Sequence, residues 1–188
     1  MRIAVVGLGF VGRPLAVALA RTGKHVTGCD PAVLPEDCSS LQGGVASSIT
    51  EIMKDVQVVI ITLPTPIKIG KPDISILERV ADDMRKEALR IGGWKGLVVN
   101  ECSVTPGTTQ RLFSWVENMG GLLVYSPERV VPGMPTCELH GQGKGLNNTY
   151  KVFAGKAEAT NLALELYEGV APLAVTSTVA LLGLVGRR

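Results

Sequence analysis

Short apolar runs alternate with longer amphipathic segments along most of the chain. The apolar runs are rich in Val, Ile and Leu, and they predict strands over residues 2–6, 25–29, 56–63, 97–101, 121–125, 150–154 and 173–176. The amphipathic segments predict helices over residues 11–22, 49–54, 74–90, 108–119 and 156–168. Because strands that alternate with helices are joined by right-handed crossovers, we predict an α/β fold, a doubly wound, mostly parallel sheet with helices on both faces.

Two stretches follow neither period. Residues 31–48 and 126–149 are punctuated by Pro and Gly, and they predict long loops.

Composition narrows the class of protein. The chain has 188 residues, of which 46% are hydrophobic and 19% charged, so it is long enough for one globular domain with a substantial core. The net charge is +2 without a long run of like charges, which argues against a nucleic-acid or membrane-surface partner. No apolar run is long enough for a secretory signal or a membrane span.

The cysteines are isolated from one another. No CxxC pair occurs and the chain has two histidines, so we expect no metal site. Unpaired thiols without a signal peptide indicate the reducing cytoplasm, and each is expected to be a small buried apolar residue. The four are Cys29, Cys38, Cys102 and Cys137.

A glycine-rich segment joins the first predicted strand to the first predicted helix. Gly7, Gly9 and Gly12 have the G-x-G-x-x-G spacing of a dinucleotide-binding loop in a Rossmann-like fold. Gly7 permits the tight turn, Gly9 lets the backbone approach a pyrophosphate, and Gly12 allows the helix to lie close to the strand. The amides at the helix start then face the phosphates. A glycine turn with a purely structural role is the alternative.

An acidic residue ends the second predicted strand. Asp30 follows the glycine loop by about 20 residues, which is the spacing of the carboxylate that binds adenosine ribose hydroxyls. Its charge would repel a 2′-phosphate, and no Arg follows it directly. The sequence therefore predicts NAD as the cofactor rather than NADP.

Four segments resemble one enzyme family. The chain is similar to the UDP-glucose/GDP-mannose dehydrogenase family of nucleotide-sugar 6-dehydrogenases, and most similar to the branch that acts on UDP-N-acetylhexosamines such as UDP-N-acetylmannosamine. The segments are IAVVGLGFVGRPLA (3–16), VVIITLPTPI (58–67), ECSVTPGTTQ (101–110) and YSPERVVPG (125–133). They occur in the family's order, and the last two are more specific than the glycine loop.

The resemblance implies contacts to the cofactor. It assigns backbone contacts to Phe10 and Val11 in the glycine loop, and a cofactor contact to Thr65. Ser103 stands where the family usually has Thr, a hydroxyl close to the nicotinamide and the catalytic water. Alternatively, Thr65 is only a rigid loop residue and Ser103 only satisfies backbone groups at a strand end.

The resemblance also implies residues for chemistry and substrate. Glu128 matches the glutamate that is linked to hydrolysis of the family's covalent intermediate. Arg129 and Val130 match positions that contact the sugar nucleotide. The alternative for Glu128 and Arg129 is a solvated surface pair. Other basic side chains have no motif around them and are interpreted as solvated, namely Lys68, Lys71, Lys151, His25 and His140.

The family reaction oxidises a primary alcohol to a carboxylate by two hydride transfers to NAD, through a thiohemiacetal and a thioester on a cysteine. The family's nucleophilic cysteine and a helping lysine come from segments downstream of the NAD domain, and no cysteine here has that motif. Cys102 is close to the predicted cofactor site but is not assigned as the nucleophile. We therefore expect residues 1–178 to be a NAD-binding domain and 179–188 a truncated tail where the family's central dimerisation helix begins.

Three readings of the function stay open. The chain is the NAD-binding domain of a nucleotide-sugar dehydrogenase that does not turn over alone, a small stand-alone NAD-dependent dehydrogenase of a hydroxy acid, or a non-catalytic NAD-binding module. The first and third imply a partner, either a second copy or missing downstream domains. One departure from the family is the short segment between Asp30 and Val56, where Pro35 stands about where the family has a basic residue near the adenosine.

Overall fold

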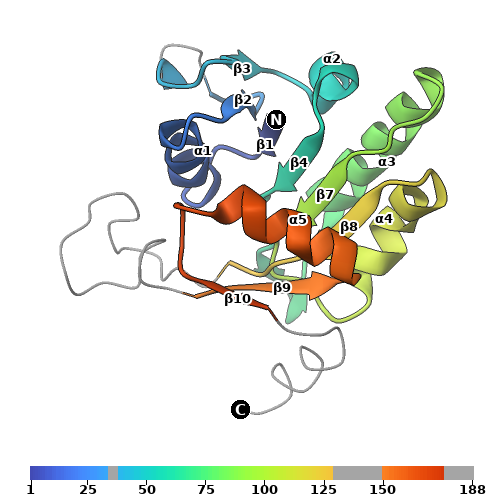
Figure 1. The fold of residues 1–188 in the computed structure, drawn as a ribbon. Coiled ribbons are helices and arrows are strands. Elements are labelled where there is room, and N and C mark those ends of the chain that lie inside the picture. The colour runs from blue at the N-terminus through green and yellow to red at the C-terminus, as the bar shows by residue number, and fades with distance from the viewer. Residues whose placement is uncertain (34–37, 129–149, 176–188) are drawn as a thin grey trace.

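The computed structural model describes residues 1–33, 38–128 and 150–175 (Figure 1). Within these residues, eight strands form one sheet in the order β10-β9-β8-β7-β4-β1-β2-β3. The strands are β1 (Arg2–Val6), β2 (His25–Cys29), β3 (Val45–Ala46), β4 (Val58–Ile61), β7 (Leu97–Asn100), β8 (Leu122–Tyr125), β9 (Lys151–Gly155) and β10 (Leu173–Val175). Arg129, Val130, Cys137, His140 and the segment 179–188 lie outside the described residues.

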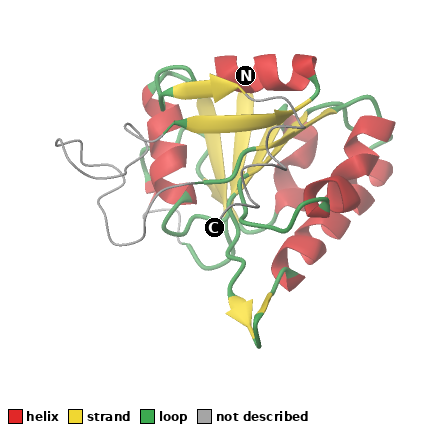
Figure 2. Cartoon of the chain, turned by 90° about the horizontal axis from the view of Figure 1, so that it is seen from below, coloured by secondary structure: helices red, strands yellow, loops and turns green. Residues whose placement is uncertain are grey.

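Helices cover both faces of this sheet, as Figure 2 shows. They are α1 (Gly12–Arg21), α2 (Ile49–Ile52), α3 (Ser75–Arg90), α4 (Thr108–Asn118) and α5 (Ala157–Tyr167), with a 3₁₀ turn (Met53–Asp55) after α2. The strand β1 lies between β2 and β4, both parallel to it, so the chain winds outward in two directions from the centre. This confirms the predicted doubly wound, mostly parallel α/β fold.

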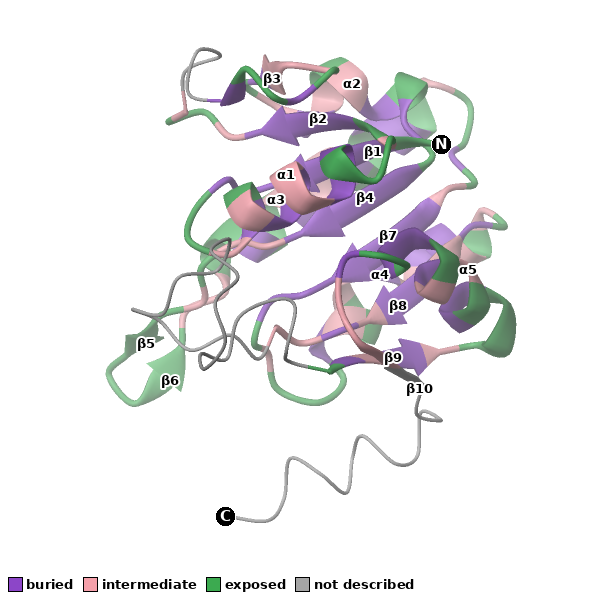
Figure 3. Cartoon of the chain, turned by 60° about the vertical axis from the view of Figure 1, so that its left-hand side comes forward, coloured by how far each residue is buried: buried purple, intermediate pink, exposed green. Residues whose placement is uncertain are grey.

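The core is divided by the sheet into two layers. Ile3 and Val5 of β1 belong to the layer that contains α1 and α5, whereas Ala4 and Val6 belong to the layer that contains α2, α3 and α4. Alternate residues of a strand point to opposite faces, so an uninterrupted apolar strand serves both layers. Figure 3 shows the central strands buried along their length.

Two strands, β9 and β10, run opposite to the other strands of the sheet. The strand β9 is antiparallel to β8, and β10 is parallel to β9. Parallel neighbours need a crossover, usually a helix, but the sequence from 126 to 149 has no helical period. The antiparallel direction brings the first residue of β9, Lys151, to the edge where the parallel strands have their carboxyl ends.

Short elements escaped the sequence analysis. The strand β3 lies in the segment predicted as a loop, and a small hairpin joins β5 (Ile67–Lys68) to β6 (Lys71–Pro72). Two residues are too few to show a period of two. The turn of the hairpin places both Ile69 (φ 50°) and Gly70 (φ 72°) in the left-handed region. Among the described residues, no helix is both long and apolar enough to cross a membrane.

Candidate functional site

The glycine loop is shaped by positions that have no room for a side chain. Gly7 has a φ of +91°, and a Cβ there would lie 2.9 Å from the carbonyl oxygen of Thr62. A Cβ on Gly12 would lie 1.8 Å from the carbonyl oxygen of Gly7, because the first turn of α1 approaches the end of β1 so closely. At Gly9 the same construction meets no atom within 4 Å, so this glycine faces open space. The loop therefore fits a pyrophosphate that approaches over Gly9.

Thr62 fastens this loop to the neighbouring strand. Its hydroxyl donates towards the carbonyl oxygens of Gly7 (2.7 Å) and Val6 (3.0 Å). It follows β4 directly, as Gly7 follows β1. The sequence analysis missed this residue, and its signal was a hydroxyl immediately after the strand that neighbours the glycine strand.

Asp30 lies beside the glycine loop, at the end of β2. One carboxylate oxygen accepts the amide of Leu8 (2.8 Å), and the other accepts the amide of Ala32 (2.9 Å). These bonds fix the carboxylate in place, and a carboxylate has about four acceptor sites. Capacity therefore remains for two ribose hydroxyls, and the role of Asp30 stays a prediction. Phe10 is exposed and Val11 precedes α1, so their backbones lie at the surface of the loop.

A cleft of about 360 Å³ opens at this edge of the sheet, between the ends of β1, β2 and β4 and the helix α3. Its lining includes Gly7, Asp30, Pro64, Arg79 and Asp83. Arg79 has no ion pair with any described residue, although other charged residues of α3 do. The cleft thus combines one carboxylate fixed at β2 with an available cation from α3. Sequence analysis missed Arg79 because helical spacing alone places it on a polar face.

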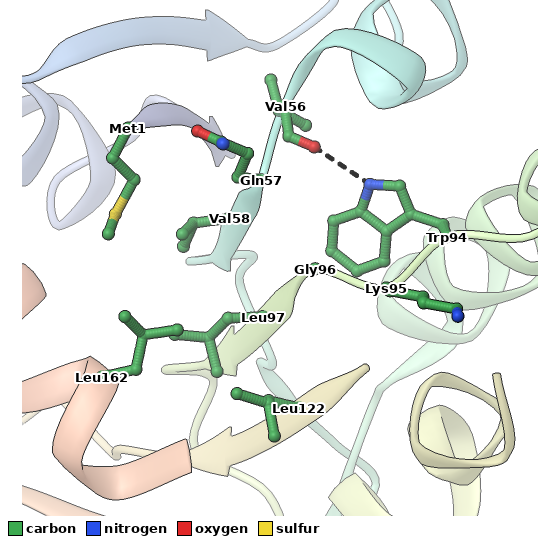
Figure 4. A pocket seen from close by; sticks show the side chains of 10 residues that line it. All are labelled: Met1, Val56, Gln57, Val58, Trp94, Lys95, Gly96, Leu97, Leu122 and Leu162. Carbon is green, nitrogen blue, oxygen red and sulfur yellow. Dashed lines mark hydrogen bonds between the residues drawn. The ribbon is translucent and has the colours of Figure 1, made fainter. Parts of the chain in front are cut away.

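A second hollow lies at the opposite edge, where the parallel strands begin (Figure 4). Its volume is about 550 Å³, and apolar side chains of β4, β7, β8 and α5 contribute to it. Two of its polar side chains are already hydrogen-bonded, since the indole of Trp94 donates to the carbonyl of Val56 (3.0 Å) and Gln57 accepts the amide of Arg2 (2.9 Å). This hollow is larger than the cleft beside Asp30, but its lining is mostly apolar.

Thr65 and Ser103 are brought together at the carboxyl edge. They follow β4 and β7, which are neighbours in the sheet, and the Thr65 hydroxyl donates to the carbonyl oxygen of Ser103 (2.8 Å). Thr65 therefore has a local structural bond, and its oxygen remains able to accept another. Both predicted cofactor contacts lie on one side of the glycine loop, and Asp30 lies on the other.

Glu128 lies next to a buried cluster of charged groups. The ammonium of Lys151 is 2.5 Å from a carboxylate oxygen of Glu128 and 2.7 Å from one of Glu101. The hydroxyl of Tyr167 donates to the same oxygen of Glu101. The Lys151 side chain is 3% exposed, so its interpretation as solvated was wrong. Glu128 is nearly buried too, at 8%, which excludes a solvated surface position for its side chain.

The register of β8 and β9 explains why Lys151 and Glu128 lie next to each other. Val124 pairs with Gly155 and Tyr125 with Ala154 in antiparallel order. Continuing that register for three residues places Glu128 opposite Lys151. Since β7 lies on the other side of β8, Glu101 at its end reaches the same ammonium group.

Burial dominates the electrostatics of the cluster. Desolvation raises the pKa of the Glu101 carboxyl, although Lys151 opposes the shift. Burial disfavours the ammonium form of Lys151, yet the neighbouring carboxylates raise its pKa. The pKa of the Tyr167 hydroxyl is raised by burial and by Glu101. Lysine and tyrosine therefore stay protonated as hydrogen-bond donors.

Burial keeps two of the cysteines, Cys29 and Cys102, in the thiol form. Burial raises the pKa of the Cys102 thiol to about 12, and its sulfur lies 3.6 Å from the carbonyl oxygen of Ile61. Burial raises the pKa of Cys29 to about 12 as well. A thiol is a poor nucleophile. Cys29, Cys38 and Cys102 are buried, as expected, and within the described ranges no group of His, Cys, Asp and Glu could hold a metal.

The sheet topology and the glycine loop define a dinucleotide-binding α/β domain. The profile of the UDP-glucose/GDP-mannose dehydrogenase family, NAD binding domain, matches residues 32–168. The chain belongs to this family as its NAD-binding domain, and NAD is the cofactor that the residues around Asp30 and Gly9 fit.

Curated relatives and solved structures agree with this assignment. UDP-N-acetyl-D-mannosamine dehydrogenase of Pyrococcus horikoshii is 32% identical over 89% of this chain and 44% of its own length. UDP-N-acetyl-D-glucosamine 6-dehydrogenase of Pseudomonas aeruginosa is 33% identical over 71% of this chain and 36% of its own length. The solved P. horikoshii enzyme has a TM-score of 0.75 at 28% identity and covers 96% of this chain. The chain spans less than half the length of these relatives.

Proposed function

We propose that this chain is the NAD-binding domain of a nucleotide-sugar 6-dehydrogenase. The intact enzyme oxidises a UDP-N-acetylhexosamine, such as UDP-N-acetylmannosamine, to the uronate by two hydride transfers to NAD. The names of the similar proteins support this substrate class. The observation that carries the proposal is the carboxylate of Asp30, fixed by the Leu8 amide beside a glycine that faces open space.

Each part of the edge has a role in this proposal. The backbone from Gly7 to Gly12 binds the pyrophosphate, and Asp30 binds the adenosine ribose. Thr65 and Ser103 lie at the nicotinamide end, where bound NAD accepts the hydride. Glu128 serves hydrolysis of the intermediate, and Arg129 and Val130 contact the sugar nucleotide.

Turnover requires a reactive thiolate, and the two thiols nearest the cofactor site among the described residues do not supply one. The two most relevant buried thiols, Cys29 and Cys102, have a pKa of about 12 and are not thiolates at neutral pH. We place the NAD domain at residues 1–178, with the nucleophile and dimer-forming segments in further chain or a second copy. The proposed location is the cytoplasm, where NAD and nucleotide sugars occur.

Calorimetry of the purified chain with NAD and NADP tests the cofactor site. We expect NAD to bind at least about tenfold more tightly, because a carboxylate that accepts ribose hydroxyls makes hydrogen bonds worth about 1.5–3 kcal/mol and repels a 2′-phosphate. Asp30→Ala should lower the affinity for NAD and reduce the ratio of NAD affinity to NADP affinity. Asp83→Asn is the matched control, since this carboxylate lines the same cleft without lying at β2. Equal affinity for NAD and NADP would contradict the role of Asp30.

An absorbance assay for NADH tests whether this chain oxidises a nucleotide sugar without further segments. The chain alone should form no NADH with UDP-N-acetylmannosamine, UDP-N-acetylglucosamine or UDP-glucose. Steady NADH formation by the chain alone would instead favour a stand-alone dehydrogenase.

A further inference from the structure

Glu128 is held by a side chain that is itself held from the opposite side. Lys151 lies between two carboxylates, with its ammonium group 2.5 Å from Glu128 and 2.7 Å from Glu101. An ammonium group has three donors and no acceptor, so it can serve both carboxylates at once. Tyr167 adds a donor from α5 to Glu101. The groups come from three neighbouring strand ends and one helix.

We propose that Lys151 and Glu101 are positioning residues that hold the Glu128 carboxylate, charged and in a fixed direction, at the carboxyl edge of the sheet. This inference rests on the proposed function, in which Glu128 accepts a proton from the water that attacks the intermediate. The water's O–H bond breaks, its proton moves to a Glu128 oxygen, and its oxygen bonds to the thioester carbonyl carbon while the C=O π pair moves onto the carbonyl oxygen. When the C=O bond forms again, the C–S bond breaks and the sulfur leaves as the thiolate of the nucleophilic cysteine, which the proposed function places in further chain or a second copy. A charged, oriented carboxylate is what this step requires.

The antiparallel direction of β9 places Lys151 within reach of Glu128 and Glu101. Its first residue lies at the edge where the parallel strands end, whereas a parallel strand in the same place would bring its last residue there. The backbone joins the arrangement as well, because the amide of Glu128 donates to the carbonyl oxygen of Glu101 (3.3 Å). Glu128 is thus tied to Glu101 through the main chain and through Lys151.

A cluster that served stability alone would be expected to satisfy all its buried polar atoms. One carboxylate oxygen of Glu101 and the hydroxyl of Ser126 are buried without a partner among the described residues. Glu101 and Ser126 follow β7 and β8 at the same register. Buried polar groups without partners are rare, and each calls for an explanation. The indole nitrogen of Trp115 is a third such group among the described residues, but the other two lie together at this cluster. This favours a functional role for the cluster.

The test measures the ionisation of Glu128 directly. Carbon-13 NMR of chain labelled at the glutamate carboxyls follows the midpoint of Glu128, which is assigned with Glu128→Gln. In Lys151→Met, Glu128 loses the ammonium group that lies 2.5 Å from its carboxylate, while the carboxylate of Glu101 stays nearby, so the midpoint should rise by about 1–3 pH units. Lys151→Arg should restore it close to the wild-type value, because it keeps the charge and the donors.

Two further variants separate an effect on Glu128 from a loss of folding and from a general effect of removing a lysine. Lys151→Met combined with Glu101→Gln removes the ammonium group together with the fully buried carboxylate and leaves Glu128, so this variant should fold even if the single variant does not, and its Glu128 midpoint should still rise. Lys156→Met is the matched control, since Lys156 pairs with Glu117 at the surface (2.9 Å) and should leave Glu128 unchanged.

The inference is overturned if Glu128 titrates at its wild-type midpoint in the double variant, or if Lys151→Arg behaves like Lys151→Met. NAD binding should persist in all these variants, because the cluster does not touch the glycine loop. A wild-type chain that binds no NAD would contradict the proposed function instead, and the carboxyl titration would still report on the cluster.

Discussion

The carboxyl edge of the sheet has two halves, one at β1 and β2 and one at β7, β8 and β9, and they use different kinds of chemical group. At β1 and β2 the site consists of backbone amides, positions without side chains and one carboxylate that faces a cleft. At β7, β8 and β9 it consists of charged side chains that are almost completely removed from solvent. The first arrangement depends on space, and the second depends on charge balance. Damage to each half should therefore be seen in a different measurement.

The two halves should also differ in how well they tolerate substitutions. Gly9 meets no neighbouring atom, so the protein's own packing places no constraint there. The Glu101 side chain, in contrast, has an exposure of 0%, so the loss of its partner Lys151 would leave a buried carboxylate with neither a counter-ion nor solvent. The cofactor half should lose binding before it loses stability, whereas the charged half should lose stability first.

The largest expected effect is on the charged half. Lys151→Met leaves two buried carboxylates without their cation and should lower the free energy of unfolding by about 3–5 kcal/mol. Adding Glu101→Gln to this variant should recover much of that loss, because the more deeply buried of the two uncompensated carboxylates is removed. Urea denaturation at neutral pH measures both. Equal destabilisation in the single and double variants would show that lost packing, rather than charge, holds this half together.

The next largest effect separates two glycines of one loop. Gly12→Ala places a methyl group against the Gly7 carbonyl and should cost about 1–3 kcal/mol of stability, together with NAD binding. Gly9→Ala meets no protein atom, so it should leave the urea midpoint unchanged while lowering NAD affinity about tenfold or more. Calorimetry and denaturation on the same two variants make the comparison. If Gly9→Ala bound NAD normally, the cofactor would not pass over this glycine.

The sequence could predict the cofactor half because its parts follow one another in a motif with fixed spacing. Gly7, Gly12 and Asp30 are found by counting, and their geometry matches the prediction. The charged half could not be predicted, because Lys151 reaches Glu101 only through the direction and register of β9. Local patterns carry no information about register across a loop of more than twenty residues, so a lysine beside an apolar run was interpreted as solvated.

The fold shows the same division between local and long-range information. The long apolar run that contains β4 and the helix α3 have clear periods, and their observed bounds lie within two residues of the predicted ones. The short strand β3 and the hairpin of β5 and β6 were missed because their residues are too few to show alternation. Their structure comes from neighbouring elements rather than from their own sequence.

An effect that is absent at neutral pH concerns the buried thiols on the face that carries α2, α3 and α4. Cys29 and Cys102 have a pKa of about 12 when folded and an ordinary value of 9.0 when unfolded. Between these values the unfolded chain releases protons that the folded chain keeps, so stability is complete below pH 9 and falls as the pH rises. Each thiol should contribute a slope of up to about 1.4 kcal/mol per pH unit. Urea midpoints from pH 8 to 11 should fall less steeply in Cys29→Ala with Cys102→Ala, and an unchanged slope would contradict this assignment.

The smallest expected effect tests whether the cofactor half uses any side-chain cation. The resemblance to the family implies a departure at Pro35, which lies outside the described residues, in place of a basic residue near the adenosine. Arg79 lines the cleft beside Asp30 from α3 and has no ion pair with a described residue. An exposed guanidinium that contacts an adenine face or a phosphate is worth about 0.5–1 kcal/mol, so Arg79→Ala should weaken NAD binding roughly two- to fivefold. Arg85→Ala is the matched control, because Arg85 lies on the same helix and pairs with Asp82. If the interaction is electrostatic, the difference between the two variants should shrink at high salt, since screening acts within about 3 Å at 1 M. Equal affinities at low salt would mean that this half recognises NAD with backbone and Asp30 alone, which would sharpen its contrast with the charged half.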